Sequence, residues 1–257
     1  MTPRLSYLIC GTPRTGSTYL CGLLASTGVT GRPESYFRVE GELEFAQRWG
    51  VDLSGGDVDR RQFLAAAVAA GSTPNGVFAA RVMWGSLENV VSKIDPDLPA
   101  HPRDDLDRLR RAFGPELRFV QLRRQDRLGQ AVSWARAEQT AYWQQGNVAQ
   151  AEPRFDADQI DELLQTIEEH NAAWRQWFAA AGVQPLMISY EDLIADPDGT
   201  IRGLLDQLGI DAGPGIVITA PDRRQADAVN AEWVQRYRAL GRPTGRRNDC
   251  PGRGSRR

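Results

Sequence analysis

The sequence of 257 residues is poor in the two side chains most used for covalent and metal chemistry. It has three widely spaced cysteines, Cys10, Cys21 and Cys250, and only two histidines, His101 and His170. An odd number of distant cysteines forms neither a disulfide framework nor a zinc motif, so we expect a reducing, cytoplasmic setting. Two histidines give little material for a histidine triad or a metal site, so we expect carboxylates to act as acids and bases and expect no metal.

Long apolar runs and a large net charge are also absent. The N-terminal apolar stretch is too short for a signal peptide, and nowhere do the roughly 20 apolar residues of a membrane span follow one another. The formal net charge of −2 argues against a broad surface for nucleic acid. The 41% of hydrophobic and 25% of charged residues suit a globular chain with one large α/β domain.

Strand-like and helical patterns alternate along the chain. Short apolar runs at 6–11, 76–84, 117–122 and 183–190 predict strands. An apolar stripe at helical spacing over 160–178 predicts a long helix whose aromatic residues belong to the core. This alternation indicates a parallel sheet with helices on both faces, that is, a three-layer α/β fold.

Other segments show where elements and the domain end. A cap at Asp196, a proline at Pro197 and a glycine at Gly209 mark the two ends of a further helix. Residues 41–75 and 144–156 are less regular, so we expect them to be excursions over the active face. We predict a single domain over 1–240 and a disordered tail, rich in arginine and glycine, over 241–257.

Residues 11–18, Gly-Thr-Pro-Arg-Thr-Gly-Ser-Thr, join a predicted strand to a predicted helix. Such a turn directs backbone N–H groups and the positive end of the helix dipole at an anion. The spacing is that of a nucleoside triphosphatase loop, but Ser17 stands at the position of the essential lysine, and Arg14 provides a cation elsewhere. A sulfuryl group carries less charge than a terminal phosphoryl group, so arginine and hydroxyl donors suffice without Mg²⁺. The alternative is an ordinary strand–helix turn without a ligand.

A second segment, 117–137, repeats the order of strand, polar turn and helix. Arg123 and Arg124 leave the predicted strand, Asp126 is placed to cap the helix, and Ser133 lies about two turns into it. An arginine fork and a serine hydroxyl there predict a second phosphate site, unless the segment is a solvated basic turn. Two such sites predict a nucleotide phosphorylated at two separate places.

Several segments resemble those of sulfotransferases. GTPRTGSTYLCGLL resembles their 5′-phosphosulfate loop, RRQDRLGQAVSWARA their 3′-phosphate motif, and YEDLIADPDGTIRGLLDQLG their third conserved segment. TGVTGRPESYF, TPNGVFAARVMW, QAVSWARA and RRQADAVNAEWVQRYR are similar, in this order, to the bacterial trehalose 2-sulfotransferase family. The similarity extends from about residue 6 to about residue 238.

The resemblance implies a fold related to P-loop kinases and a sulfuryl donor, 3′-phosphoadenosine-5′-phosphosulfate (PAPS), as co-substrate. It also implies an acceptor hydroxyl on a saccharide, either trehalose or a glycosylated metabolite, and a homodimer. By matching positions, the 5′-phosphosulfate end would be held by Arg14, Thr15, Gly16, Ser17 and Thr18.

Further site residues follow from the same resemblance. It assigns the 3′-phosphate to Arg124 and Ser133, and it folds Arg224 and Gln225 over the nucleotide. Tyr190 would lie beside the adenine, although a tyrosine that closes a strand is as often a core residue.

The sequence departs from this family in the loop that carries its proposed catalytic base. The family pattern G-x-P-x-E-aromatic-Phe reads here as GRPESYF, so Ser35 stands at the glutamate position and Glu34 precedes it. A shift of one residue in an extended loop turns the side chain to the opposite side. We still expect Glu34 to take the acceptor proton, because a loop after a proline can re-aim it. A second departure is Arg81, where the family tends to have a lysine.

Other carboxylates and other functions remain open. Glu40, Glu42 and Glu44 are the alternative bases, unless they form the solvated start of an acidic helix. In the sulfuryl transfer that the resemblance implies, we expect Arg14 to stabilise the leaving 5′-phosphate.

A P-loop-like small-molecule kinase is an alternative function that would need a loop lysine, which Ser17 replaces. A non-catalytic nucleotide-binding module is another, since the base has moved.

Overall fold

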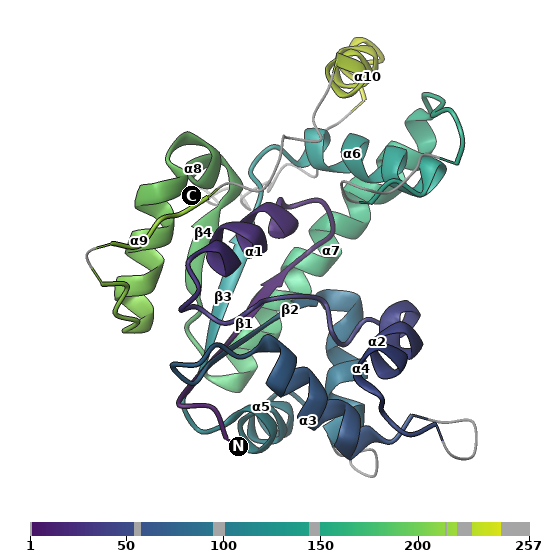
Figure 1. The fold of residues 1–257 in the computed structure, drawn as a ribbon. Coiled ribbons are helices and arrows are strands. Elements are labelled where there is room, and N and C mark those ends of the chain that lie inside the picture. The colour runs from purple at the N-terminus through teal and green to yellow at the C-terminus, as the bar shows by residue number, and fades with distance from the viewer. Residues whose placement is uncertain are drawn as a thin grey trace, which may run out of the picture. The chain divides into compact units, whose positions relative to one another are not determined.

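The computed structural model describes residues 2–53, 58–94, 101–143, 150–213, 215–219 and 228–242. Its strands are β1 (Leu5–Gly11), β2 (Val77–Met83), β3 (Leu117–Arg123) and β4 (Leu186–Ser189). Its helices, shown in Figure 1, are α1 (Ser17–Ser26), α2 (Glu42–Trp49), α3 (Arg60–Gly71), α4 (Trp84–Ile94), α5 (Pro102–Phe113), α6 (Arg127–Thr140), α7 (Ala157–Ala181), α8 (Tyr190–Ala195), α9 (Pro197–Leu208) and α10 (Ala228–Ala239), with a short 3₁₀ helix η1 (Val39–Gly41).

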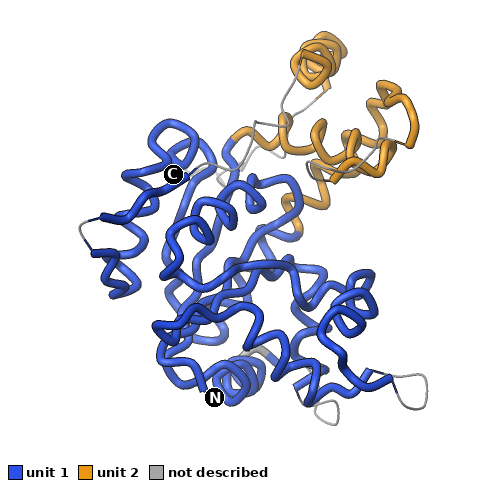
Figure 2. The backbone as a smooth tube through the Cα atoms, viewed as in Figure 1, with its two compact units in different colours: residues 1–125, 170–223 blue, residues 126–169, 224–257 orange. Residues whose placement is uncertain are grey.

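The chain divides into two compact units, coloured separately in Figure 2. The first comprises residues 1–125 and 170–223, and the second comprises residues 126–169 and 224–257. Among the described residues, no helix of either unit is long and apolar enough to span a membrane. The single domain over 1–240 stays a prediction.

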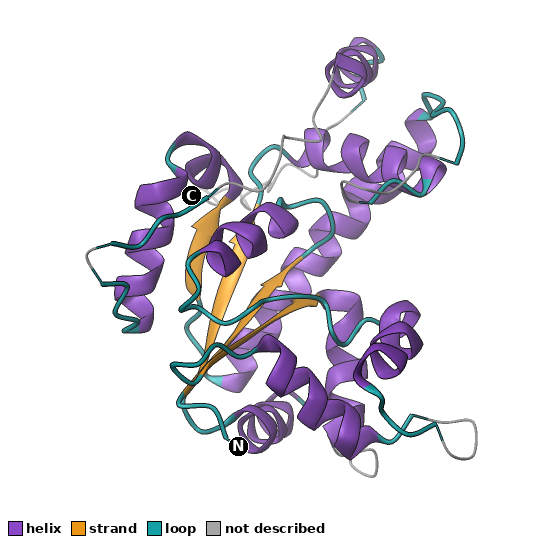
Figure 3. Cartoon of the chain, in the orientation of Figure 1, coloured by secondary structure: helices purple, strands orange, loops and turns teal. Residues whose placement is uncertain are grey.

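The first unit is built on a parallel sheet with the strand order β2-β1-β3-β4. All four predicted strands are confirmed. Tyr7 and Ile9 of β1 pack with α1 and α9 on one face, whereas Leu8 and Cys10 pack with α3, α4, α5 and the end of α7 on the other. Both faces are covered (Figure 3), so the strands need apolar side chains at every position, which explains their unbroken apolar runs. The predicted three-layer fold is confirmed.

Helix boundaries follow the predicted signals in some places and not in others. Asp196 accepts a hydrogen bond from the Gly199 N–H at 2.9 Å, Pro197 is the first residue of α9, and Gly209 ends that helix with φ = 67°. Of the two stretches expected to be irregular, residues 144–149 lie outside the described residues. Residues 41–75 are more regular than expected, because they contain α2 and α3. These short helices are stabilised mainly by tertiary contacts with the core, which local periodicity does not record.

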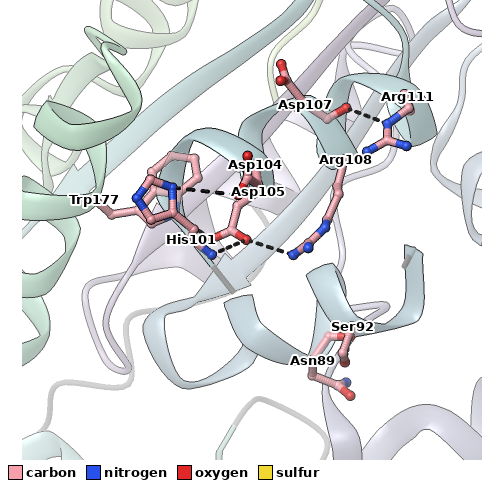
Figure 4. A network of polar contacts seen from close by, with 9 residues as sticks. All are labelled: Asn89, Ser92, His101, Asp104, Asp105, Asp107, Arg108, Arg111 and Trp177. Carbon is pink, nitrogen blue, oxygen red and sulfur yellow. Dashed lines mark hydrogen bonds and ion pairs between the residues drawn. The ribbon is translucent and has the colours of Figure 1, made fainter. Parts of the chain in front are cut away.

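A buried polar network joins α5 to α7 within the first unit (Figure 4). The carboxylate of Asp105 pairs with Arg108 at 3.3 Å and accepts hydrogen bonds from Trp177 Nε1 at 3.2 Å and the His101 backbone N–H at 3.3 Å. Removing one partner of a buried ion pair typically costs about 3–5 kcal/mol. The network therefore has a structural explanation, away from the residues predicted to bind ligand.

The second unit contains α6, α10 and the first half of α7, which share an apolar core that includes Trp233. Asp126 caps α6, as predicted, by accepting a hydrogen bond from the Gly129 N–H at 3.0 Å. Arg242 lies in the predicted tail but donates to Asp158 and Asp161 at 2.6 Å. The rest of the predicted tail, 243–257, lies outside the described residues.

Candidate active site

The predicted site residues of the first unit lie at the carboxyl ends of neighbouring strands. Arg14 follows β1, Arg81 lies near the end of β2, Arg124 follows β3 and Tyr190 follows β4. In a parallel sheet these ends share one edge. The chain continues from β1 to β2 on one side and places β3 on the other, and open α/β sheets bind their ligands where the strand order reverses in this way. The topology therefore places the first predicted phosphate loop at this switch point.

The phosphate loop has the backbone of an anion site. Arg14 has φ = 64° and Gly16 has φ = 85°, both in the left-handed region. Gly16 is the N-cap of α1, and its own lack of a side chain leaves the first N–H groups of the helix without a side-chain cap. A non-glycine residue at positive φ costs on the order of 1–3 kcal/mol, and such residues cluster at ligand sites. The loop is thus suited to an anion at the start of α1.

The ring of Tyr190 packs directly on this loop. A Cβ atom at Gly16 would lie 2.4 Å from Tyr190 Cδ2, so no larger residue fits there. The Arg124 guanidinium lies 4.7 Å from the centroid of the same ring, and its Nη1 donates to the Arg14 carbonyl at 3.4 Å. We had expected Tyr190 to close β4, but it is the first residue of α8. The structure brings these four predicted residues together, while a place for Tyr190 beside adenine stays a prediction.

Buried contacts hold the loop from within. The Thr15 hydroxyl donates to the Thr12 carbonyl at 2.9 Å, and Trp174 Nε1 donates to the Gly11 carbonyl at 2.9 Å. Trp174 is fully buried, which confirms that the aromatic residues of α7 form core. These two hydrogen bonds satisfy buried carbonyl groups and anchor the loop to the core.

Arg81 brings a further positive charge to the loop. Its Nη1 donates to Thr18 Oγ1 at 2.8 Å and to Ser17 Oγ at 3.3 Å, and its Nε donates to Ser35 Oγ at 2.7 Å. The sequence marked Arg81 only as a departure from its relatives. These contacts join residues 46 to 64 positions apart, and no local sequence pattern predicts contacts over such separations.

The loop that carries Glu34 is attached to β2. The Arg81 backbone N–H donates to the Glu34 carbonyl at 2.9 Å, and the Arg32 N–H donates to the Gly71 carbonyl at 2.8 Å. Ser35 contacts Arg81, whereas the side chain of Glu34 lines a pocket of about 400 Å³. Among the described residues, the Glu34 carboxylate has no hydrogen bond or ion pair. The neighbouring side chains thus have different surroundings, as the shift of one residue predicted.

The pocket is lined by aromatic and charged side chains. Tyr36 and Trp49 line it with ring centroids 5.6 Å apart, and Arg32 and Arg48 line it together with Glu34. Aromatic faces suit the apolar faces of sugar rings, and charged side chains bind hydroxyl groups. Trp49 and Arg48 belong to α2, in the stretch that the sequence pattern left without structure.

The alternative carboxylates are already engaged. Glu42 pairs with Lys93 at 2.5 Å, and Glu44 pairs with Arg48 at 2.6 Å. Glu40 is exposed and lies 3.8 Å from Arg38. Of the four glutamates that we considered as bases, only Glu34 has no such pair among the described residues.

Burial changes the acidity of two groups in the pocket. Burial raises the pKa of Cys21 to about 11; the charge of Arg81 lowers it and that of Glu34 raises it by smaller amounts. Burial also raises the pKa of Tyr36, and the charge of Glu34 adds to this effect. Both groups therefore stay protonated at neutral pH, and a thiol in that state is a poor nucleophile.

The remaining predicted nucleotide-binding residues lie in the second unit or outside the described residues. Ser133 is buried on α6 in the second unit, whereas Arg124 belongs to the first. Arg224 and Gln225 lie outside the described residues. Within the described ranges, no group of three or more histidine, cysteine, aspartate or glutamate side chains is placed to hold a metal ion.

Comparisons with known proteins point in one direction. The profile of the family described as Stf0 sulphotransferase matches residues 6–240. Trehalose 2-sulfotransferase of Mycobacterium tuberculosis is 32% identical, over 93% of this chain and 97% of the relative. Trehalose 2-sulfotransferase of Mycolicibacterium smegmatis is 29% identical, over 91% and 94%. Among solved structures, a sulfotransferase domain from the curacin biosynthetic pathway has a TM-score of 0.52 at 15% identity, over 90% of this chain and 83% of that one. That likeness shows the shared fold.

Proposed function

Because the chain belongs to the Stf0 sulphotransferase family, we propose that it transfers the sulfuryl group of PAPS to a hydroxyl of a saccharide. One observation supports this proposal above all. Arg81 donates hydrogen bonds both to Thr18, at the end of the phosphate loop, and to Ser35, whose neighbour Glu34 lines the aromatic pocket. The names of the curated relatives make trehalose the first acceptor to test.

Two groups of residues fit a doubly phosphorylated nucleotide. We assign the 5′-phosphosulfate end to the start of α1, because the loop that carries Arg14 leads into this helix and because the hydroxyls of Ser17 and Thr18 lie there beside N–H groups without a side-chain cap. We assign the 3′-phosphate to Arg124, whose guanidinium follows the adjacent strand. Ser133, Arg224 and Gln225 stay predictions from the sequence.

The chemistry we propose is an in-line displacement at sulfur. Glu34 accepts the proton of the acceptor hydroxyl, whose oxygen forms a bond to sulfur on the side opposite the bridging oxygen. The bond from sulfur to that bridging oxygen breaks, and its electron pair stays on the 5′-phosphate. Arg14 and the N–H groups of the loop stabilise the charge that develops there. No step requires a metal ion.

Kinase activity is not favoured. Ser17 replaces the lysine that grips a terminal phosphate, and its hydroxyl accepts a hydrogen bond from Arg81 at 3.3 Å. A homodimer and a cytoplasmic location are proposals that rest on the sequence resemblance and on the cysteine pattern, respectively.

A calorimetric titration tests the donor assignment. The metal-free protein is titrated with adenosine 3′,5′-bisphosphate and, separately, with ATP and Mg²⁺. We expect the bisphosphate to bind at least about tenfold more tightly, a difference of about 1.4 kcal/mol. A preference for ATP, or binding of neither nucleotide, would contradict the proposal.

A further inference from the structure

We infer that Ser35 and Arg81 act as a pair, in which Ser35 orients the Arg81 guanidinium across the start of α1 so that Arg81 binds the sulfuryl oxygens during transfer. This inference rests on the proposed function, because it assumes that a sulfuryl group lies at the phosphate loop. Arg81 is then a catalytic residue and Ser35 a positioning residue.

The first argument is the way in which the guanidinium is held. Its Nε donates to Ser35 Oγ at 2.7 Å, and its Nη1 donates to Thr18 Oγ1 at 2.8 Å. The guanidinium is planar, so fixing two of its nitrogens fixes the direction of the third. Nη2 makes no hydrogen bond with the described residues, which leaves two N–H donors for a ligand.

The second argument concerns charge. Arg81 is half-buried, and among the described residues no carboxylate lies within ion-pair distance of it. A partly desolvated cation without a counter-ion attracts an anionic ligand more strongly than one already paired. A glutamate in place of Ser35 would supply such a counter-ion. A serine hydroxyl orients the guanidinium and leaves its charge available.

The third argument is position. Arg81 belongs to β2, where it lies opposite Ile9 of β1, so its backbone is fixed within the sheet. Its side chain contacts the loop that we assign to the donor, and its N–H donates to the carbonyl of Glu34 at 2.9 Å. The moving group passes between these two segments, and a preorganised cation there stabilises charge on its oxygens.

The test is a double-mutant cycle with Ser35→Ala, Arg81→Met and the double variant. Turnover is measured at saturating PAPS and trehalose, and affinity is measured for PAPS and for adenosine 3′,5′-bisphosphate, which lacks the sulfuryl group. We expect Arg81→Met to lower turnover about a hundredfold. Loss of the Ser35 hydrogen bond should cost about tenfold, and the double variant should be no slower than Arg81→Met. Affinity for the bisphosphate should change by less than about twofold.

Ser92→Ala is a matched control. Among the described residues its exposed hydroxyl donates only to the Asn89 carbonyl, at 3.2 Å within α4, so turnover should not change. If the fold losses in turnover of Ser35→Ala and Arg81→Met multiply in the double variant, the two residues act independently and the proposed pairing is wrong. A fall in bisphosphate affinity as large as the fall in turnover would show that Arg81 only supports the loop, and would overturn its contact with sulfuryl.

The two proposals fail differently. A wild-type protein that binds neither the bisphosphate nor PAPS refutes the proposed function, and with it the inference. If the wild type binds both nucleotides but does not sulfate trehalose, the inference is tested by comparing the affinities of the wild type and of Arg81→Met for PAPS and for the bisphosphate. Arg81→Met must then weaken PAPS binding about tenfold without weakening bisphosphate binding, and equal effects on both would overturn the inference.

Discussion

Replacing Arg14 with alanine is expected to lower turnover at saturating PAPS by about a hundredfold or more. Arg14 lies in the phosphate loop, and its carbonyl accepts a hydrogen bond from Arg124 at 3.4 Å. We assign its guanidinium to the 5′-phosphate, where additional negative charge develops as the bond to sulfur breaks. Loss of such a group slows the chemical step more than it weakens binding of the ground state. Steady-state kinetics with PAPS and trehalose provides the measurement.

Backbone strain at Arg14 requires its own control. Because φ is 64° at this position, Arg14→Gly removes the side chain while favouring the observed backbone. Both variants should be slow to a similar degree if the guanidinium is what matters. Arg124→Ala should mainly weaken nucleotide binding, with a smaller effect on turnover at saturation. Near-normal turnover of Arg14→Ala would show that the leaving-group role is wrong.

The second large effect is expected for Glu34→Gln. The amide keeps the shape of the side chain but cannot accept the acceptor's proton, and general-base catalysis contributes typically about 10²–10⁴-fold. Turnover should fall within that range while affinity for adenosine 3′,5′-bisphosphate stays the same. Kinetics at saturating donor and calorimetry on the same preparation measure both quantities.

Glu40→Gln serves as the matched control. Glu40 is an exposed glutamate near the same segment, 3.8 Å from Arg38, and its loss should leave turnover within about twofold of the wild type. Normal turnover in Glu34→Gln together with slow turnover in Glu40→Gln would show that Glu40, and not Glu34, is the base.

The sheet and its loops were predictable because their signals are local. Strands covered on both faces are apolar throughout, and a glycine loop between a strand and a helix is a local pattern that can be read in the sequence. Parallel order then requires Arg14, Arg124 and Tyr190 to meet at one edge. This much of the candidate site follows from sequence patterns and topology.

The acceptor side was less predictable. Trp49 and Arg48 lie on α2, which is only eight residues long, so their place in the pocket with Glu34 depends on packing. The contact between Arg81 and Ser35 joins residues 46 positions apart. Hydrogen bonds over that separation follow from the completed fold, and single-sequence patterns contain no trace of them.

Sulfation of trehalose is the most direct test of the whole account. The purified protein is incubated with PAPS and trehalose, and mass spectrometry follows the sugar while chromatography follows adenosine 3′,5′-bisphosphate. We predict a sugar product heavier by one sulfuryl group, formed in equal amount with the bisphosphate and formed about a hundredfold more slowly by Arg14→Ala. Binding of the bisphosphate without a sulfated product from trehalose, or from a panel of other saccharides, would contradict the account and support a non-catalytic nucleotide-binding protein.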